Sequence, residues 1–289
     1  MIEKSSQDLL IPYLLGSIFY FLLFITTSYY ARIKGFLSLP FKKFSGIYTS
    51  GVDVFFNILF FILSFSSTGF LIALISSKGF PLSIFNQIAI PLFPFAFNIC
   101  LIYLYGCFNS KFRPKALIKD MLYPGKKSVA KDIRDGFISF LLSLPPLFTF
   151  ITLSEAILTS LNAQKGLGQD AVNFLIGAKE NPISLSIALT TIIIGAPVIE
   201  EFLFRAVIQS FLRKKAGAIV SILFTSVFFS VFHFSLNQGF QNIVIIISLF
   251  ILSIYLGFVY EKTRSLFSSI TLHVTFNLIN AIKIIFYSS

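Results

Sequence analysis

The sequence predicts an all-α membrane protein, a polytopic bundle of about eight transmembrane helices with both chain ends outside the cytoplasm. Three observations predict this fold class. First, only 12% of the 289 residues are charged and 56% are hydrophobic, whereas about a quarter of the residues of a soluble domain are charged. Second, the apolar runs are as long as the roughly 20 residues that a membrane-spanning helix needs. Third, basic residues cluster in every second connection between these runs.

The apolar runs define the predicted helices in chain order. The first run is longer than the apolar core of about 7–15 residues in a signal peptide, so we interpret it as a retained helix. A short helix over 169–179 is expected at the membrane interface, and Asn181-Pro182 is expected to start the fifth span. The eight predicted spans are residues 9–30, 54–76, 86–108, 136–161, 183–212, 216–236, 242–260 and 266–286.

The distribution of Lys and Arg orients these spans. The connections after spans 1, 3, 5 and 7 hold 17 of the 23 basic residues, and the other connections with the N-terminus hold 4. Because basic residues are enriched in cytoplasmic loops, the first group is predicted to face the cytoplasm. We expect one membrane domain over 1–289, with helices 1–4 in 1–161, a basic cytoplasmic loop at 109–135, and helices 5–8 in 183–286. The net charge of +11 is explained by this topology and by membrane lipids as partners; nucleic acid is not an expected partner.

Span 5 carries three ionisable residues within six positions: Glu200, Glu201 and Arg205. A charge at the centre of a span costs about 2.5–3.5 kcal/mol, so these side chains must be paired or face water. Glu201 and Arg205 are four residues apart and can form an ion pair on one helix face. Glu200 lies about 100° further round the helix. Its carboxylate is therefore expected to point elsewhere, where it is free for chemistry.

Both histidines of the chain lie in predicted spans. His233 follows Phe229 by four residues in span 6, and His273 precedes Asn277 by four residues in span 8. Each spacing places its two residues on one helix face. Taken singly, either histidine is more simply explained as a hydrogen-bonded packing residue. Taken together with the glutamate pair, the two histidines indicate one shared site. The other polar residues of the spans that we interpret as structural are Asn98, Glu155 and Asn280.

These residue types permit the hydrolysis of an amide bond. A carboxylate and an imidazole that converge on one water can remove its proton, a role predicted for Glu200 and His233. His273 and Asn277 are suited to donate hydrogen bonds to the oxyanion of a tetrahedral intermediate. A metal is the rival: zinc would take Glu200, His233 and His273 as ligands, although the His-Glu-x-x-His spacing of zinc proteases is absent. Serine or cysteine catalysis has weaker support, since no Gly-x-Ser-x-Gly motif occurs.

Three motifs in chain order resemble those of a known family. They are Glu-Glu-x-x-x-Arg over 200–205, Phe-x-x-x-His over 229–233 and His-x-x-x-Asn over 273–277. This set resembles the CAAX-protease and bacteriocin-processing (CPBP, or Abi) family of intramembrane endopeptidases, which includes the type II CAAX prenyl endopeptidase, the ras-converting enzyme. The resemblance covers the C-terminal third of the chain, and helices 1–4 match no motif.

The resemblance implies an eight-helix bundle with a conical cavity that opens to the cytosol. It implies that Glu200 and His233 activate the water and that His273 and Asn277 stabilise the oxyanion. The residues that it implies to support the site are Glu201, Arg205 and Phe229. Members of the family are described both as metalloproteases and as metal-free glutamate proteases, so the resemblance leaves the metal open.

The expected function is therefore that of an intramembrane endopeptidase. Its substrate would be a membrane-associated or lipidated protein or peptide, cut near the membrane surface. We expect an integral multi-pass membrane protein, in the plasma (inner) membrane if the source is prokaryotic. Two alternatives remain: a proton-coupled transporter, because Glu and His also form proton relays in membranes, and a non-proteolytic binding or immunity protein. The inverted repeats typical of many transporters are not visible in the sequence.

Overall fold

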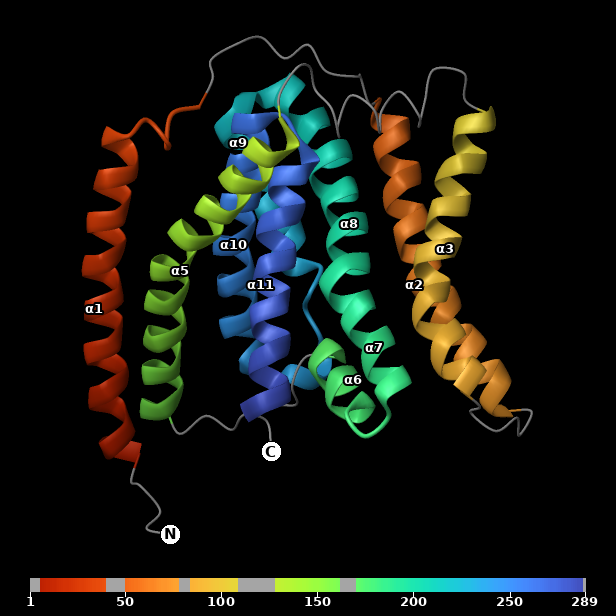
Figure 1. Cartoon of the computed structure of the whole chain (residues 1–289), viewed down its shortest axis with the longest axis horizontal. Coiled ribbons are helices and arrows are strands. Elements are labelled where there is room, and N and C mark those ends of the chain that lie inside the picture. Colours follow the sequence, from red (N-terminus) through yellow and green to blue (C-terminus); the bar gives the residue numbers. More distant parts are fainter. Residues whose placement is uncertain (1–5, 40–49, 78–83, 109–127, 162–169, 288–289) are drawn as a thin grey trace.

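The computed structural model describes residues 6–39, 50–77, 84–108, 128–161 and 170–287, and within these ranges it is helical with short turns and no strand. The helices lie side by side and alternate in direction (Figure 1). Five helices of the described residues are long and apolar enough to cross a membrane: Leu10–Ile33, Val129–Ser160, Pro182–Val231, Gln241–Thr263 and Leu266–Phe286. The predicted all-α, multi-pass membrane bundle is thus confirmed.

The elements have the following bounds. The long helices are α1 (Ser6–Ile33), α2 (Gly51–Ser77), α3 (Ile84–Phe108), α5 (Val129–Ser160), α9 (Ser210–Val231), α10 (Gln241–Thr263) and α11 (Leu266–Tyr287). Shorter pieces connect α5 to α9: α6 (Asp170–Ala178), α7 (Pro182–Thr190), the π-helix η1 (Thr191–Gly195), α8 (Ala196–Glu201) and the π-helix η2 (Phe202–Gln209). A 3₁₀ turn, η3 (Leu236–Gln238), lies between α9 and α10.

The centre of the bundle is formed by α5, α9, α10, α11 and the segment from α7 to η2. α1 packs along the outer side of α5, while α2 and α3 pack on each other and against the segment from α7 to η2 (Figure 1). The hydrophobic core brings together side chains from all five of these central elements and from α2, and it is almost fully shielded from solvent. Its fully buried members include Phe204, Phe229, Leu252, Leu256 and Leu272.

Two helix boundaries differ from the prediction. α5 begins at Val129, seven residues earlier than predicted, so the end of the predicted loop 109–135 is helical; residues 109–127 lie outside the described residues. Asp132 and Asp135 are buried in these first turns, where carboxylates interact favourably with the positive end of a helix. α9 ends at Val231, five residues before the predicted end of span 6, and places His233 in the following turn.

Predicted spans 5 and 6 lie in the 50 residues Pro182–Val231 as two helical parts that meet at Gly217, where the backbone is not helical. The start of this stretch is as predicted. Pro182 is its first residue, and the Asn181 side chain accepts hydrogen bonds from the N–H groups of Ile183 (3.0 Å) and Ser184 (3.2 Å). These bonds satisfy two of the donors that a helix N-terminus leaves free. The predicted short helix before it is α6.

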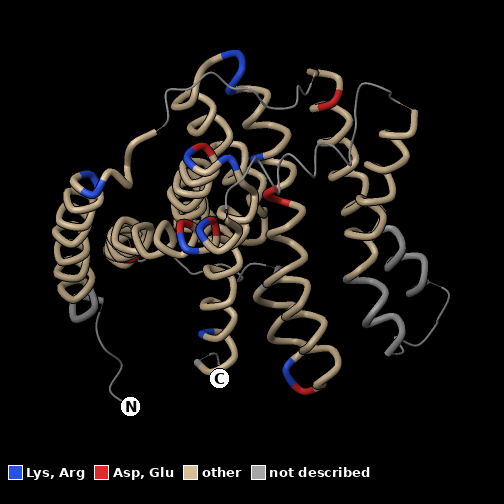
Figure 2. The backbone as a smooth tube through the Cα atoms, turned by 45° about the horizontal axis from the view of Figure 1, so that its top comes forward, with Lys and Arg blue, Asp and Glu red and all other residues tan. Residues whose placement is uncertain are grey.

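Charged residues gather at one end of the bundle. Arg213 and Arg264 both pair with Glu261, each at 2.5 Å, and Lys262 Nζ donates to the Phe36 carbonyl at 2.5 Å. The connections after spans 1, 5 and 7 therefore lie together, as the alternation of basic residues predicts. Figure 2 shows blue and red positions side by side here and long tan stretches along the helices. α1 begins and α11 ends at the opposite end (Figure 1); the side of the membrane that each end faces stays a prediction.

Gly136 lies at a close contact between α5 and α11. Among the glycines of the described residues, it leaves the least room for a side chain. A methyl group there would lie 2.4 Å from the Ser268 carbonyl oxygen and 2.9 Å from Thr271 Cβ. Gly136→Ala should therefore force the helices apart and lower the free energy of unfolding by about 1–3 kcal/mol, measured by thermal unfolding in detergent. Gly177→Ala is the matched control, because no atom lies within 4 Å of its added methyl group. Equal unfolding temperatures for the two variants would contradict this close packing.

Candidate active site

The two glutamates lie at the end of α8, which is bounded by π-helices on both sides. Pro197 is a cause of this irregularity, because proline has no N–H to bond the carbonyl four residues earlier. The Ala196 N–H instead bonds the Thr191 carbonyl five residues back, which is the π-helical pattern. π-Turns often occur at functional sites because they redirect the side chains that follow. Here they direct Glu200 and Glu201 to different neighbours.

Glu201 and Arg205 form the predicted ion pair, with 3.0 Å between Oε2 and Nε. Both side chains are completely buried. Arg205 Nη2 also donates to Ser253 Oγ at 3.1 Å, and the guanidinium lies over the Phe229 ring at 5.2 Å. A buried charge is tolerated only when it is paired and hydrogen-bonded. Ser253 is one of two serines, with Ser248, in the apolar α10 run, and its contact with Arg205 could not be predicted from the sequence.

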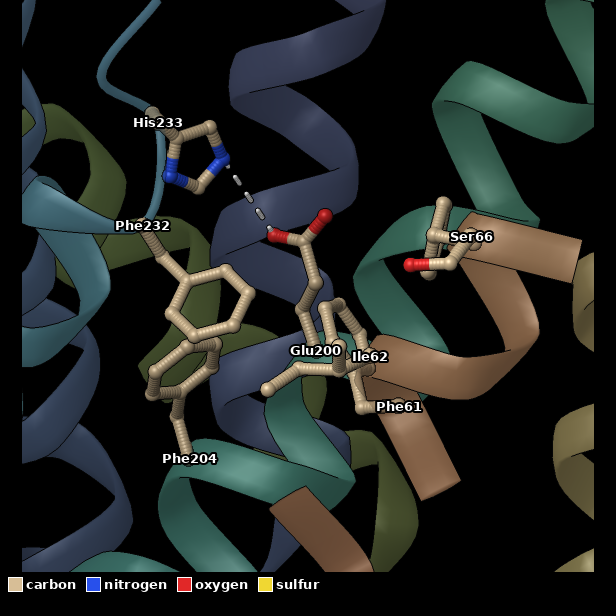
Figure 3. A pocket seen from close by; sticks show the side chains of 8 residues that line it. Phe61, Ile62, Ser66, Glu200, Phe204, Phe232 and His233 are labelled. Carbon is tan, nitrogen blue, oxygen red and sulfur yellow. Dashed lines mark ion pairs between the residues drawn. The ribbon is translucent and has the colours of Figure 1, made fainter. Parts of the chain in front are cut away.

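Glu200 points away from Arg205 and toward both histidines. Its Oε2 atom lies 3.9 Å from His233 Nε2 and 3.9 Å from His273 Nε2. This oxygen is buried and accepts no hydrogen bond from the residues that the structure describes. Figure 3 shows the carboxylate of Glu200 facing the His233 ring. Three separate chain segments thus bring Glu200, His233 and His273 together, as the sequence analysis expected.

The far nitrogen of each imidazole is anchored. His233 Nδ1 lies 2.8 Å from the Phe229 carbonyl oxygen, and His273 Nδ1 lies 3.0 Å from Glu201 Oε1. Both partners accept hydrogen bonds, so each Nδ1 must carry the proton and each neutral ring offers a lone pair at Nε2. The Phe229 ring packs against both imidazoles, with centroids 4.9 and 5.7 Å away. Phe229 therefore supports the site through its ring and its carbonyl.

This anchoring makes a prediction about tautomers. In protein labelled with ¹⁵N-histidine, two imidazoles contribute signals, because the chain has two histidines. Both neutral rings should show the Nδ1–H tautomer, with the ¹⁵N shift of an unprotonated Nε2. Glu201→Leu removes the acceptor of His273 and should change that tautomer while leaving His233 as it is. An Nε2–H tautomer at both rings in the wild-type protein would contradict the assigned geometry.

Asn277 lies one turn beyond His273 on α11 but contacts a different atom. Its Nδ2 donates to the backbone carbonyl of Ile192 in η1 at 2.8 Å. The Asn277 amide, which was predicted from the sequence to donate a hydrogen bond to the oxyanion, therefore donates to the protein backbone in this structure. The oxyanion role of Asn277 stays a prediction.

A pocket of about 390 Å³ opens beside Glu200. Most of its wall is apolar, and Ser66 from α2 adds one hydroxyl to the two ionisable groups. The α2 side of the pocket could not be predicted from the sequence, because no ionisable residue marks it. The lining residues, most of them labelled in Figure 3, are Phe61, Ile62, Phe65, Ser66, Glu200, Phe204, Phe232 and His233.

The predicted zinc ligands match zinc in chemistry but not in spacing. Bonds of about 2.1 Å in a tetrahedral site put two ligand atoms about 3.4 Å apart, whereas 3.9 Å separates Glu200 Oε2 from each Nε2. Among the described residues, no group of three or more His, Cys, Asp and Glu side chains is placed to hold a metal ion. The three donors as placed therefore do not fit a zinc ion.

Comparison with known proteins identifies the region that carries this site. The family model described as type II CAAX prenyl endopeptidase Rce1-like matches residues 182–279. The matched region runs from the start of α7 into α11 and contains each predicted site residue. No curated protein and no solved structure matches the chain.

Proposed function

We propose that this chain is an intramembrane endopeptidase that uses Glu200 and His233 to activate water. Its substrate is a membrane-associated or lipidated protein or peptide. The match of residues 182–279 to the Rce1-like family model of type II CAAX prenyl endopeptidases supports the proposal, because these residues carry the site. The observation that carries the proposal is the placement of Glu200 Oε2 at 3.9 Å from two imidazole nitrogens. This spacing is too long for a direct hydrogen bond and suits a shared water.

One water fits between these groups. A water oxygen about 2.8 Å from both Glu200 Oε2 and an Nε2 atom would bond both at an angle near 90°. Glu200 takes a proton from this water as its oxygen attacks the carbonyl carbon of the substrate. The same carboxyl group then passes that proton to the leaving amine nitrogen. The C–N bond breaks, releasing an amine that carries one proton of the water and a carboxyl group that keeps the other.

The carboxylate behind His273 bears on the stabilisation of the oxyanion. Glu201 accepts from Nδ1 of this ring at 3.0 Å, and a carboxylate behind a ring stabilises its imidazolium form. His273 is therefore the imidazole best placed to take up a second proton, at Nε2, and to donate it in a hydrogen bond to the oxyanion.

The aromatic pocket supplies the place for the substrate. Apolar walls with a few polar groups are typical of sites that orient an apolar ligand. A hydrophobic side chain or lipid chain next to the scissile bond would pack against Phe61, Phe65 and Phe232. The peptide carbonyl would then lie at the polar end, near Glu200.

The test is peptide cleavage by the purified protein in liposomes. Quenched fluorescent peptides, with and without an attached lipid chain, should be cut, and mass spectrometry should locate one broken peptide bond. The same samples should hold less than about one zinc per ten chains and keep their activity after dialysis against a chelator, because the spacing of the three donors does not suit zinc. Intact reporters in the presence of folded protein would refute the protease. One zinc per chain, with loss of activity after chelation, would refute the metal-free mechanism.

A further inference from the structure

The Ile192 carbonyl has lost its helical partner. In an α-helix it would accept from the N–H of residue 196, but the Ala196 N–H bonds the Thr191 carbonyl. In a π-helix it would accept from residue 197, which is proline and has no N–H. An unpaired carbonyl within a membrane-spanning segment costs several kcal/mol. Ile192 therefore needs a donor from elsewhere in the protein.

Asn277 supplies this donor from another helix, at 2.8 Å. On the same helix, four residues earlier, His273 bonds Glu201 at 3.0 Å. One face of α11 thus holds the other segment at two points, Ile192 before α8 and Glu201 at the end of α8. These two attachments bracket the six residues that carry the glutamates.

The first attachment bears on the direction of Glu200. A π-turn takes up one extra residue compared with an α-turn, and each residue of a helix turns the next by about 100°. If η1 relaxed to an α-helix, every side chain after it would rotate by about that angle relative to α7. Glu200 would then turn to the direction that Glu201 takes now. Ile199 would turn to the direction that Glu200 takes now, so whether a carboxylate or an apolar side chain faces the histidines depends on η1.

We propose that Asn277 is a positioning residue: its amide replaces the hydrogen bond that Pro197 removes from the Ile192 carbonyl, and this bond holds the π-helix that aims Glu200 at the two histidines. This positioning role rests on the proposed function, because peptide cleavage is the activity that Asn277 would control. It assigns Asn277 an action through the backbone of another helix, in place of the contact with the substrate oxyanion expected from the sequence.

A double-mutant cycle with Pro197→Ala tests the proposal, because alanine restores an N–H next to the Ile192 carbonyl. Asn277→Ala should lower kcat by tenfold or more, with little change in KM, since misplacement of a catalytic group by about 1 Å can cost about 100-fold. In the Pro197→Ala background the same change should cost less than about threefold, because coupled sites are not additive. Asn280→Ala is the matched control on α11: its amide bonds the Phe276 carbonyl of its own helix, and its activity should equal that of the wild type.

Two further readouts do not need activity. In substrate-free Asn277→Ala, the ¹⁵N signal of His233 should shift, although His233 lies on another segment; a donor used only by the oxyanion would leave it unchanged. If Asn277→Ala folds poorly, the double-mutant cycle can be measured by unfolding temperature in place of kcat. Adding Pro197→Ala to Asn277→Ala should then restore the yield of folded protein. Equal losses in both backgrounds with an unchanged His233 signal would overturn the proposal. An inactive wild-type protein would refute the proposed protease function. The ¹⁵N signal of His233 and the unfolding cycle would still decide whether Asn277 positions Glu200.

Discussion

Glu200→Gln should reduce peptide cleavage by about a thousandfold, the usual contribution of a general base. Glutamine has nearly the same shape, but its amide cannot take the proton of the attacking water. The fold should be unaffected, because Glu200 Oε2 accepts no hydrogen bond from the described residues. The measurement is the kcat for the liposome-bound reporter, with unfolding temperature as the check on folding.

Glu155→Gln is the matched control for this result. Glu155 lies in the last two turns of α5, a helix that supplies none of the predicted site residues. The same change of carboxylate to amide there should leave kcat within about twofold of the wild type, as expected for a residue outside the catalytic machinery. Cleavage at the normal rate by Glu200→Gln would remove Glu200 from the mechanism, whatever the control shows.

Arg205→Met should have the largest effect on stability. It leaves the Glu201 carboxylate completely buried without its cation, and breaking a buried pair from one side costs about 3–5 kcal/mol. The Phe229 ring also loses the guanidinium that lies over it at 5.2 Å. The free energy of unfolding in detergent, followed by circular dichroism, should fall by this amount.

Replacing both partners separates stability from activity. In Glu201→Leu/Arg205→Met no buried charge is left unpaired, so the free energy of unfolding should return to within about 1–2 kcal/mol of the wild type. Activity should stay low, because His273 Nδ1 then has no acceptor to fix its ring. A double variant as unstable as Arg205→Met alone would show that the ion pair is not the cause of the instability.

Much of the site followed from spacing along the helices. Four residues between Glu201 and Arg205 predicted their ion pair, and the 100° turn to Glu200 predicted a carboxylate that faces elsewhere. The cost of charge in lipid then required Glu200 to have polar neighbours, and the two histidines of the chain are the predicted ones, although His233 lies in the turn after α9. These inferences held because helix geometry and burial of charge are local rules that a sequence displays directly.

The remaining details depend on which atoms a backbone irregularity leaves unpaired. Pro197 is visible in the sequence, but the carbonyl that it deprives depends on whether the preceding turn is α or π. The partner of Asn277 was therefore not predictable, and neither was the contact between His273 and Glu201, which requires the packed arrangement of α8 and α11. The α2 wall of the pocket was missed for a related reason, since Phe61 and Phe65 look like any lipid-facing residues until their neighbours are known.

The bend at Gly217 has a consequence for how the chain enters a bilayer. A straight helix of the 50 residues from Pro182 to Val231 would be about 75 Å long, more than twice the thickness of the hydrocarbon layer, about 30 Å. Gly217 has φ of 84° and ψ of 177°, a conformation that glycine adopts readily and other residues rarely do. The non-helical backbone at Gly217 thus lets the polypeptide double back between two helices. Without this reversal Glu200 and His233 would lie tens of ångströms apart on a rod too long for any membrane.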